Sequence, residues 1–191
     1  MNDKKLFLFV LGGKPVGRNV EQHDVFFTAG NSVEECAQSI KKHWNITGLH
    51  VDTYMVVEQV DGFDVTFSIT PPAESQLKKL FFINCGGYRE NDLEEYHKKI
   101  VVAAETLDDA KKKVKQDQFF FKGVNMPNAQ RHIDDKINLL GFDVDDVMVI
   151  SDQLFPKSYI TLTPRQRAKF KNNKIMITGY LLVEDILNTK K

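Results

Sequence analysis

Two similar stretches of sequence, KLFLFVLGG at residues 5–13 and KLFFINCGG at residues 79–87, determine the fold. The second begins 74 residues after the first, and the same spacing relates further residues without a gap: Glu21 to Glu95, His23 to His97, and Ala29 to Ala103. An ordered series of such matches in one chain indicates an internal duplication. Each stretch is an apolar run of strand length, so each repeat is predicted to begin with a β-strand.

The matches resume at a different spacing beyond Trp44, where the second copy has an insertion. His50-Val51-Asp52 then matches His132-Ile133-Asp134, 82 residues later, residues 62–65 match 141–144, and residues 68–71 match 161–164. We therefore divide the chain into the following parts: a first repeat at residues 1–70, a linker at 71–78, a second, diverged repeat at 79–164 with an insertion near 118–131, and a basic C-terminal extension at 165–191.

The order of elements within each repeat follows from local signals. In the first copy, Ser32 and Glu35 form a capping box, echoed by Thr106 and Asp109 in the second. The helix that follows carries an apolar stripe made of Val33, Cys36, Ala37, Ile40 and Trp44. Strands are predicted near 6–11 and 23–28 before the helix and near 51–57 and 63–69 after it, the last two joined by an Asp61-Gly62 hairpin. The predicted class is α+β: two tandem ββαββ repeats with mostly antiparallel sheet and one covering helix per repeat.

The glycine pairs Gly12-Gly13 and Gly86-Gly87 allow two interpretations. A phosphate-binding loop requires a helix N-terminus after the glycines, whereas a polar loop and a strand follow here. We therefore expect turn glycines with positive φ. Lys14 and Arg18 beside the first pair keep an anion pocket as the lesser alternative, and both are candidate binding residues.

Histidines supply the candidate site residues. In His50-x-Asp52, as in His132-x-Asp134, the two side chains of a strand face the same side and are placed to hydrogen-bond. A carboxylate on one imidazole nitrogen leaves the other for a proton or a metal ion. The alternative is a buried polar pair that fixes strand register, and we favour it about two to one over the functional interpretation. His23 precedes Asp24 on a strand, so these two face opposite sides, and the second copy keeps His97 but has Lys98 in place of Asp24.

Composition excludes several classes of function. The 26 basic and 26 acidic residues balance, so nothing points to nucleic acid as a partner, although residues after 156 are locally basic. No apolar run reaches the ~20 residues that span a bilayer. Two cysteines, Cys36 and Cys85, do not form a disulfide framework, and no Cys/His group has the spacing of a zinc site. We expect a cytoplasmic protein with reduced thiols, without a membrane, metal ion or cofactor.

The first repeat resembles a known family. The run at residues 6–14, then Gly17-Arg18-Asn19, residues 21–27 and residues 50–63, are similar to the domain-of-unknown-function family DUF1543. Members are bacterial and carry one or two copies of the domain, so the resemblance implies the two-copy form. It implies no activity.

Two functions are compatible with these features. The first is a non-enzymatic binding or assembly module that forms a homo-oligomer, since no catalytic motif is present. The second is a small-molecule enzyme with an acid/base histidine, His23 or His50, in a cleft between the repeats. The candidate catalytic residues are then His23, His50 and Asp52, and the candidate binding residues are Lys14, Arg18, His97, His132 and Asp134.

Overall fold

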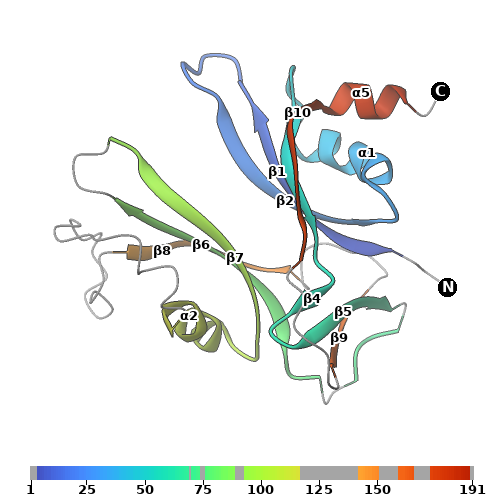
Figure 1. Ribbon diagram of the computed structural model, residues 1–191, viewed down its shortest axis with the longest axis vertical. Coiled ribbons are helices and arrows are strands. Elements are labelled where there is room, and N and C mark those ends of the chain that lie inside the picture. The colour runs from blue at the N-terminus through green and yellow to red at the C-terminus, as the bar shows by residue number, and fades with distance from the viewer. Residues whose placement is uncertain are drawn as a thin grey trace. The chain divides into compact units, whose positions relative to one another are not determined.

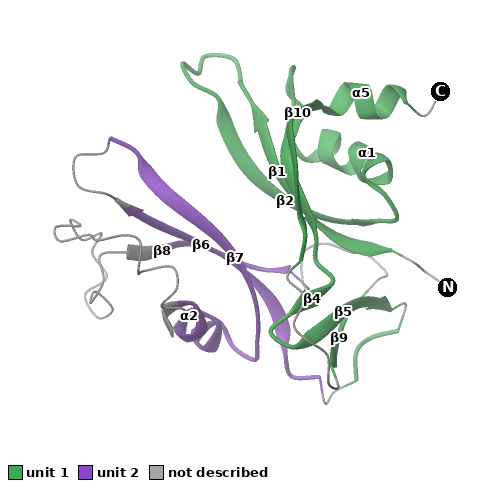
Figure 2. Cartoon of the chain, viewed as in Figure 1, with its two compact units in different colours: residues 1–73, 154–191 green, residues 74–153 purple. Residues whose placement is uncertain are grey.

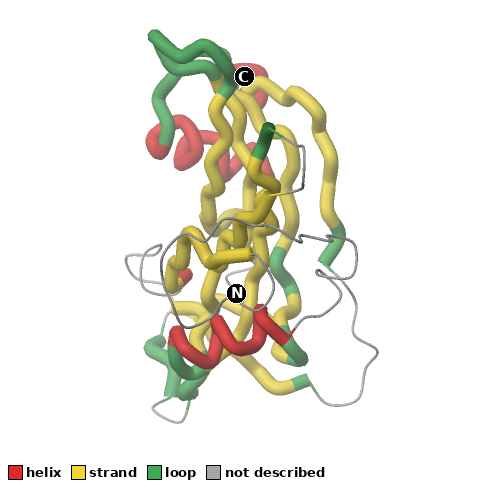
Figure 3. Tube along the Cα trace, turned by 90° about the vertical axis from the view of Figure 1, so that its left-hand side faces the viewer, coloured by secondary structure: helices red, strands yellow, loops and turns green. Residues whose placement is uncertain are grey.

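The computed structural model describes residues 4–68, 70–73, 76–88, 93–116, 142–150, 159–165 and 173–189. Strands dominate this part of the chain (Figure 3) and they pair antiparallel, which confirms the predicted α+β class. Contacts divide the chain into unit 1, Met1–Ala73 with Leu154–Lys191, and unit 2, Glu74–Gln153 (Figure 2). This division differs from the predicted repeats, because the C-terminal residues belong with the first unit.

Unit 1 is built on a four-stranded antiparallel sheet. Its strands are β1 (Lys5–Gly13), β2 (Gln22–Gly30), β3 (His50–Val56) and β10 (Ile175–Leu182), in the order β10-β3-β1-β2. The helices α1 (Val33–His43) and α5 (Val183–Asn188) lie on one face of this sheet (Figure 1). The apolar core between them is formed mainly by alternate residues of β1 and by the buried stripe of each helix: Phe7, Phe9, Leu11, Cys36, Ala37, Ile40, Val183 and Ile186.

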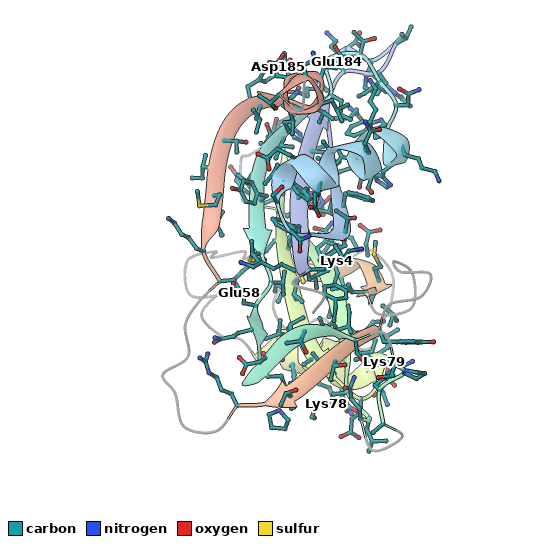
Figure 4. All side chains as sticks on the ribbon, turned by 90° about the vertical axis from the view of Figure 1, so that its right-hand side faces the viewer. Lys4, Glu58, Lys78, Lys79, Glu184 and Asp185 are labelled. Carbon is teal, nitrogen blue, oxygen red and sulfur yellow. The ribbon has the colours of Figure 1, made fainter. Side chains whose placement is uncertain are left out.

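The C-terminal residues are therefore not an appendage. β10 extends the sheet of unit 1 at its edge, and α5 places Val183 and Ile186 in the core. Lys41 of α1 lies 3.4 Å from Glu184, which is labelled with Asp185 in Figure 4 at the first turn of α5. This segment is basic in composition, yet it contains a strand that pairs with β3 and a helix with a buried apolar face.

A small second sheet in unit 1 is formed by β4 (Gln59–Val60), β5 (Phe63–Ser68) and β9 (Tyr159–Pro164). The predicted hairpin is confirmed, because Asp61 and Gly62 have φ of 50° and 85°, as a tight turn of type I′ requires. β5 also pairs with β9, a strand nearly a hundred residues later.

Unit 2 has a three-stranded antiparallel sheet with β7 (Glu95–Ala104), β6 (Lys79–Tyr88) and β8 (Phe142–Val149) in the order β7-β6-β8. The register repeats that of unit 1 at a spacing of 74 residues, since Lys5 pairs with Gly30 and Lys79 with Ala104. The helix α2 (Leu107–Gln116) buries Ala110 and Val114 against this sheet.

The sequence alignment of the second copy beyond its helix is wrong, as the pairing of β8 shows. Gly12 pairs with His50 across β1 and β3, and Gly86 pairs with Asp143 across β6 and β8. β8 therefore takes the place of β3 at a spacing of 93 residues, and residues 141–144 do not correspond to residues 62–65. His132, Asp134 and the insertion near 118–131 lie outside the described residues.

The prediction that the two glycine pairs are turn residues with positive φ is also wrong. Gly12 and Gly13 end β1, and Gly86 and Gly87 lie near the end of β6, so they are strand residues. The positive-φ glycines of the described chain are elsewhere: Gly17, Gly48, Gly62 and Gly179. The glycines are needed for space, because a Cβ at Gly13 would collide with Ile46, and one at Gly12 would collide with His50.

Both predicted helix starts are confirmed. The Ser32 hydroxyl accepts a hydrogen bond from the backbone N–H of Glu35 (3.4 Å), and the Thr106 hydroxyl accepts one from that of Asp109 (3.1 Å). None of the described helices has the length and hydropathy that crossing a membrane requires.

Candidate functional site

Four polar side chains gather near the end of β1 in unit 1: Glu21, His23, His50 and Asp52, hereafter the unit 1 cluster. Gly12 pairs with His23 on β2 and with His50 on β3, so the two histidines flank a residue that has no side chain. Directly paired residues share a face of the sheet. Leu11 and Val51 point into the helix-covered core, so the cluster lies on the other face.

A β-bulge positions Asp52. Val10 pairs with Thr53 and Leu11 with Val51, so Asp52 is the extra residue of β3. A bulge redirects a side chain relative to a regular strand. Here the two carboxylate oxygens face different rings: Oδ1 lies 3.3 Å from Nε2 of His50, and Oδ2 lies 3.3 Å from Nε2 of His23. The prediction that His50 and Asp52 face the same side is confirmed.

His50 is the buried member, with only 1% of its side chain exposed. Its Nδ1 lies 2.8 Å from the carbonyl oxygen of Gly48, and because a carbonyl only accepts, Nδ1 carries the proton. Its Nε2 lies 3.1 Å from Oε1 of Glu21. Within the described chain, this buried Nε2 has no partner with hydrogen-bond geometry. The ring nitrogen therefore faces two carboxylates and bonds to neither.

A second bulge holds the ring of His50 in place. β10 shifts register against β3 between Ile177 and Leu181, with Gly179 at φ 76°. The Thr178 hydroxyl donates to the carbonyls of Val51 and Asp52, and the Tyr180 ring stacks on His50 with centroids 3.8 Å apart. The C-terminal strand thus fixes both the bulged backbone of β3 and the imidazole.

The space at Gly12 is part of the site. A Cβ there would collide with Nε2 of His50 and approach Oδ2 of Asp52 to 3.0 Å. Any larger residue at this position would displace the imidazole or the carboxylate. The glycine that the sequence predicts as a turn residue is therefore a requirement of the cluster.

Unit 2 carries a related group, hereafter the unit 2 cluster: Glu95, His97 and Asp145. Nε2 of His97 lies 3.3 Å from Oδ2 of Asp145 and 3.5 Å from Oε2 of Glu95, and one donor atom from each residue lies within 4.8 Å of the others. Asp145 is again the bulge residue, at the register shift between Asn84 and Cys85. The candidate residue His97 therefore lies in a group of possible metal ligands.

Two further predicted candidates, Lys14 and Arg18, lie outside both clusters, whereas His132 and Asp134 fall outside the described residues. Lys14 and Arg18 are exposed in the loop between β1 and β2, and the ion pairs of the described clusters do not include them. Asp24 faces the helix side and pairs with His43 of α1 (Nε2 to Oδ2, 3.0 Å). His43 also stacks on Phe26, so this ion pair belongs to the helix packing.

Sequence reasoning missed four residues of the clusters and their surroundings. Glu21 and Glu95 each precede a histidine by two residues at the start of a strand, and this same-face spacing was a usable signal. Because the second copy was aligned in the wrong register, Asp145 was not recognised as the equivalent of Asp52. Tyr180 gave no signal, because it lies outside both predicted repeats.

Comparisons with known proteins support the family resemblance. Residues 18–67 match the model of the Domain of Unknown Function (DUF1543) family. These residues include the whole unit 1 cluster. A search of curated proteins found no match.

A solved structure supports the fold. The chain is similar to a protein Il1583 from Idiomarina loihiensis, with 26% sequence identity and a TM-score of 0.63 over 94% of this chain and 98% of that one. Neither likeness carries a named activity, so any inference about function depends on the chemistry of the clusters.

Proposed function

We propose that the protein is a non-enzymatic binding and assembly module, in which the unit 1 cluster is the ligand-binding site. The observation that supports this is Nε2 of His50: it is buried, its ring is held by Gly48 and Tyr180, and it faces two carboxylates without a hydrogen bond. A buried polar atom without a partner costs free energy. A ligand that binds the imidazole and the carboxylates together removes that cost.

Binding is favoured over catalysis by the position of the imidazole. A general acid or base has to reach the substrate proton within hydrogen-bond distance. His50 is covered on one side by Tyr180 and is 1% exposed, so a substrate has little access to it. The remaining members are exposed enough for a ligand to enter: Glu21 is 40%, His23 is 50% and Asp52 is 23% exposed.

One observation favours an enzyme as the second candidate. His23 is half exposed, and Asp52 lies 3.3 Å from its Nε2, which is the geometry of a base oriented by a carboxylate. Its Nδ1 is then the atom that exchanges a proton with a small-molecule substrate. This candidate requires turnover that depends on His23 and Asp52 together, whereas a binding module requires only affinity.

The experiment that tests the binding site measures thermal unfolding of Glu21→Gln, Asp52→Asn and His23→Ala in ligand-free buffer. Residues kept for binding are not optimised for stability, so we expect midpoints at or above that of the unaltered protein. Asp24→Asn is the matched control, because it breaks a histidine–aspartate pair that packs α1, and we expect its midpoint to fall. A similar fall in all four variants would contradict the proposal.

We propose that copies of this chain associate through the edge strand β10. This strand is at the edge of the four-stranded sheet, and Ile175, Ile177 and Tyr180 are 62%, 81% and 61% exposed. Exposed apolar side chains on an edge strand favour pairing with another chain. Light scattering is expected to give a homo-oligomer that Ile177→Lys dissociates. Val16→Lys, at an exposed loop position, is the matched control.

The cellular setting is proposed to be the bacterial cytoplasm. Cys36 and Cys85 are buried in the apolar cores of their units, as expected of reduced thiols. The chain has no net charge, which supports neither a nucleic acid nor an anionic surface as the ligand.

A further inference from the structure

We infer that the unit 2 cluster, formed by Glu95, His97 and Asp145, binds one divalent transition-metal ion. The ligands are the imidazole of His97 and one carboxylate oxygen from each acidic residue. This site goes beyond the proposed function, because it lies in the other unit and does not depend on what the unit 1 cluster binds. It replaces the sequence-based expectation that the protein holds no metal ion.

The spacing of the donor atoms fits a shared ion. Nε2 of His97 lies 3.3 Å from Oδ2 of Asp145 and 3.5 Å from Oε2 of Glu95, and one donor atom from each residue lies within 4.8 Å of the others. Ligand atoms that share one ion at about 2.0–2.2 Å are roughly 2.9–3.6 Å apart. Among the described residues, no other group of three possible ligands is as compact.

A proton accounts for this arrangement less well than a metal ion does. A charged imidazole that hydrogen-bonds a carboxylate is about 2.7–2.9 Å from it, and both contacts of His97 are longer. A proton on Nε2 also points in one direction, whereas the two carboxylates belong to β7 and β8, on either side of β6. A divalent ion binds ligands from several directions and balances both carboxylate charges.

The two carboxylates approach the same space, which lies over Gly86 in the central strand. Gly86 pairs with His97, so the imidazole also belongs to this position of the sheet. A Cβ at Gly86 would collide with Oδ2 of Asp145 and Oε1 of Glu95. Two carboxylates that share a site repel each other when both are ionised. A bound cation removes this repulsion and uses the space that the glycine leaves open.

A buried amide oxygen on the same face of the sheet is an independent observation. Asn84 lies two residues before Gly86 on β6, so the two positions share a face. Nδ2 of Asn84 donates to Oδ2 of Asp146 (3.2 Å), but the buried Oδ1 has no hydrogen-bond partner in the described chain. An ion with three protein ligands completes its coordination with water. We assign the donor that Oδ1 lacks to such a water.

The mixture of nitrogen and oxygen donors indicates the class of ion. One imidazole with two carboxylates suits Zn²⁺, Mn²⁺, Fe²⁺ or Co²⁺ better than Ca²⁺ or Mg²⁺, which prefer oxygen ligands alone. The three side chains are between 27% and 37% exposed, so an ion reaches them from solvent and its remaining positions stay open to water.

The test uses the full-length chain stripped with a chelator and titrated with Co²⁺, monitored by the visible absorption of bound Co²⁺, and with Zn²⁺ by calorimetry. We expect one ion per chain, and we expect His97→Ala and Glu95→Gln each to weaken binding at least about tenfold. The matched controls are His23→Ala and Glu21→Gln, which change the equivalent residues 74 positions earlier. Both are expected to bind as the unaltered protein does, because the described unit 1 residues do not bring three ligand atoms together as closely.

The controls decide where the ion binds. Absence of Co²⁺ and Zn²⁺ binding, or equal binding by Glu95→Gln and the unaltered protein, overturns the inference. A loss in Glu21→Gln as large as that in Glu95→Gln also overturns it, because the ion then does not belong to unit 2. Glu95→Gln keeps the shape of the side chain, so its circular dichroism is expected to be unchanged and a loss of affinity reports the missing carboxylate. The unit 1 binding site is tested separately, by the unfolding midpoints of its own variants.

Discussion

The two units place different residues on the same framework. In both, a central strand with a glycine pairs with a histidine-bearing strand on one side and a bulged strand on the other, and the bulge residue is an aspartate, Asp52 or Asp145. The residue opposite the glycine is His50 in unit 1 and Asp143 in unit 2. The framework is therefore shared, and the two units differ in which residue of the bulged strand pairs with the glycine.

The two clusters also differ in exposure: the unit 1 cluster contains a buried histidine, whereas the unit 2 cluster is partly exposed. In unit 1, the imidazole of His50 is 1% exposed and packs beneath Tyr180 of the added strand β10. In unit 2, the three cluster side chains are between 27% and 37% exposed. A buried ring of fixed orientation loses less conformational freedom when a ligand binds than exposed side chains do. We therefore expect the unit 1 cluster to change shape less on binding than the unit 2 cluster.

The largest expected effect comes from the position opposite the glycine. His50→Ala removes a buried ring, its bond to Gly48 and its contact with Tyr180, so we expect a loss of about 2–4 kcal/mol in unfolding free energy. His97→Ala changes the histidine that pairs with Gly86 in unit 2; its side chain is 37% exposed, so the change is expected to cost less than ~1 kcal/mol. Chemical denaturation of the two variants provides the comparison. Equal losses would contradict the difference between the units.

The next effect comes from the glycines. In Gly12→Ala the new Cβ meets the ring of His50, which Gly48 and Tyr180 hold, whereas in Gly86→Ala it meets the carboxylate ends of Asp145 and Glu95. Carboxylate ends of exposed side chains move easily, but a packed ring does not. We expect Gly12→Ala to cost about 1–3 kcal/mol and Gly86→Ala clearly less. Thermal unfolding of both variants measures these losses in stability. A larger loss in Gly86→Ala than in Gly12→Ala would contradict a rigid unit 1 cluster.

The sequence predicts those parts of the fold that depend on local signals. The capping residues Ser32 and Thr106 mark the two helices, and Asp61-Gly62 marks the hairpin, because each acts on residues within one turn. Pairing between distant strands is not local. The pairing of β10 with β3 joins residues more than a hundred positions apart, and no pattern in either strand specifies its partner.

For the site, too, the sequence predicts what depends on neighbouring residues and misses what depends on the pairing of distant strands. His50 and Asp52 were found because two residues separated by one on a strand share a face. Their counterparts in unit 2 were misplaced, because the identical letters of His132-x-Asp134 were a more visible match than the aspartates of β8. The contribution of Tyr180 depends on a bulge and on strand order, and both are properties of the folded chain.

A smaller effect is expected at the bulge of β10, a strand without a counterpart among the described strands of unit 2. Thr178→Val keeps the size of the side chain but removes the hydroxyl that donates to the carbonyls of Val51 and Asp52. The expected loss in unfolding free energy is about 1 kcal/mol, because the bulge that carries Asp52 is less firmly held. Thr53→Val, on the neighbouring strand, is a control for the change of a threonine. An unfolding free energy equal to that of the unaltered protein would show that this hydroxyl does not hold the bulge.

The smallest expected effect is a change in the pKa of Asp109, and it distinguishes the start of α2 from the start of α1. The Thr106 hydroxyl hydrogen-bonds the Asp109 carboxylate and so lowers the pKa of Asp109, helped by Lys112. In unit 1, the Glu35 carboxylate instead accepts from the backbone N–H of Asn31. A lowered pKa contributes stability that is present above the ordinary carboxyl pKa and is lost as the pH falls through the lowered value. Thr106→Val is expected to return the pKa of Asp109 towards its ordinary value in a carboxyl NMR titration, while Ser32→Ala leaves it unchanged. An unchanged pKa in Thr106→Val would mean that Lys112, and not the capping hydroxyl, is the principal cause.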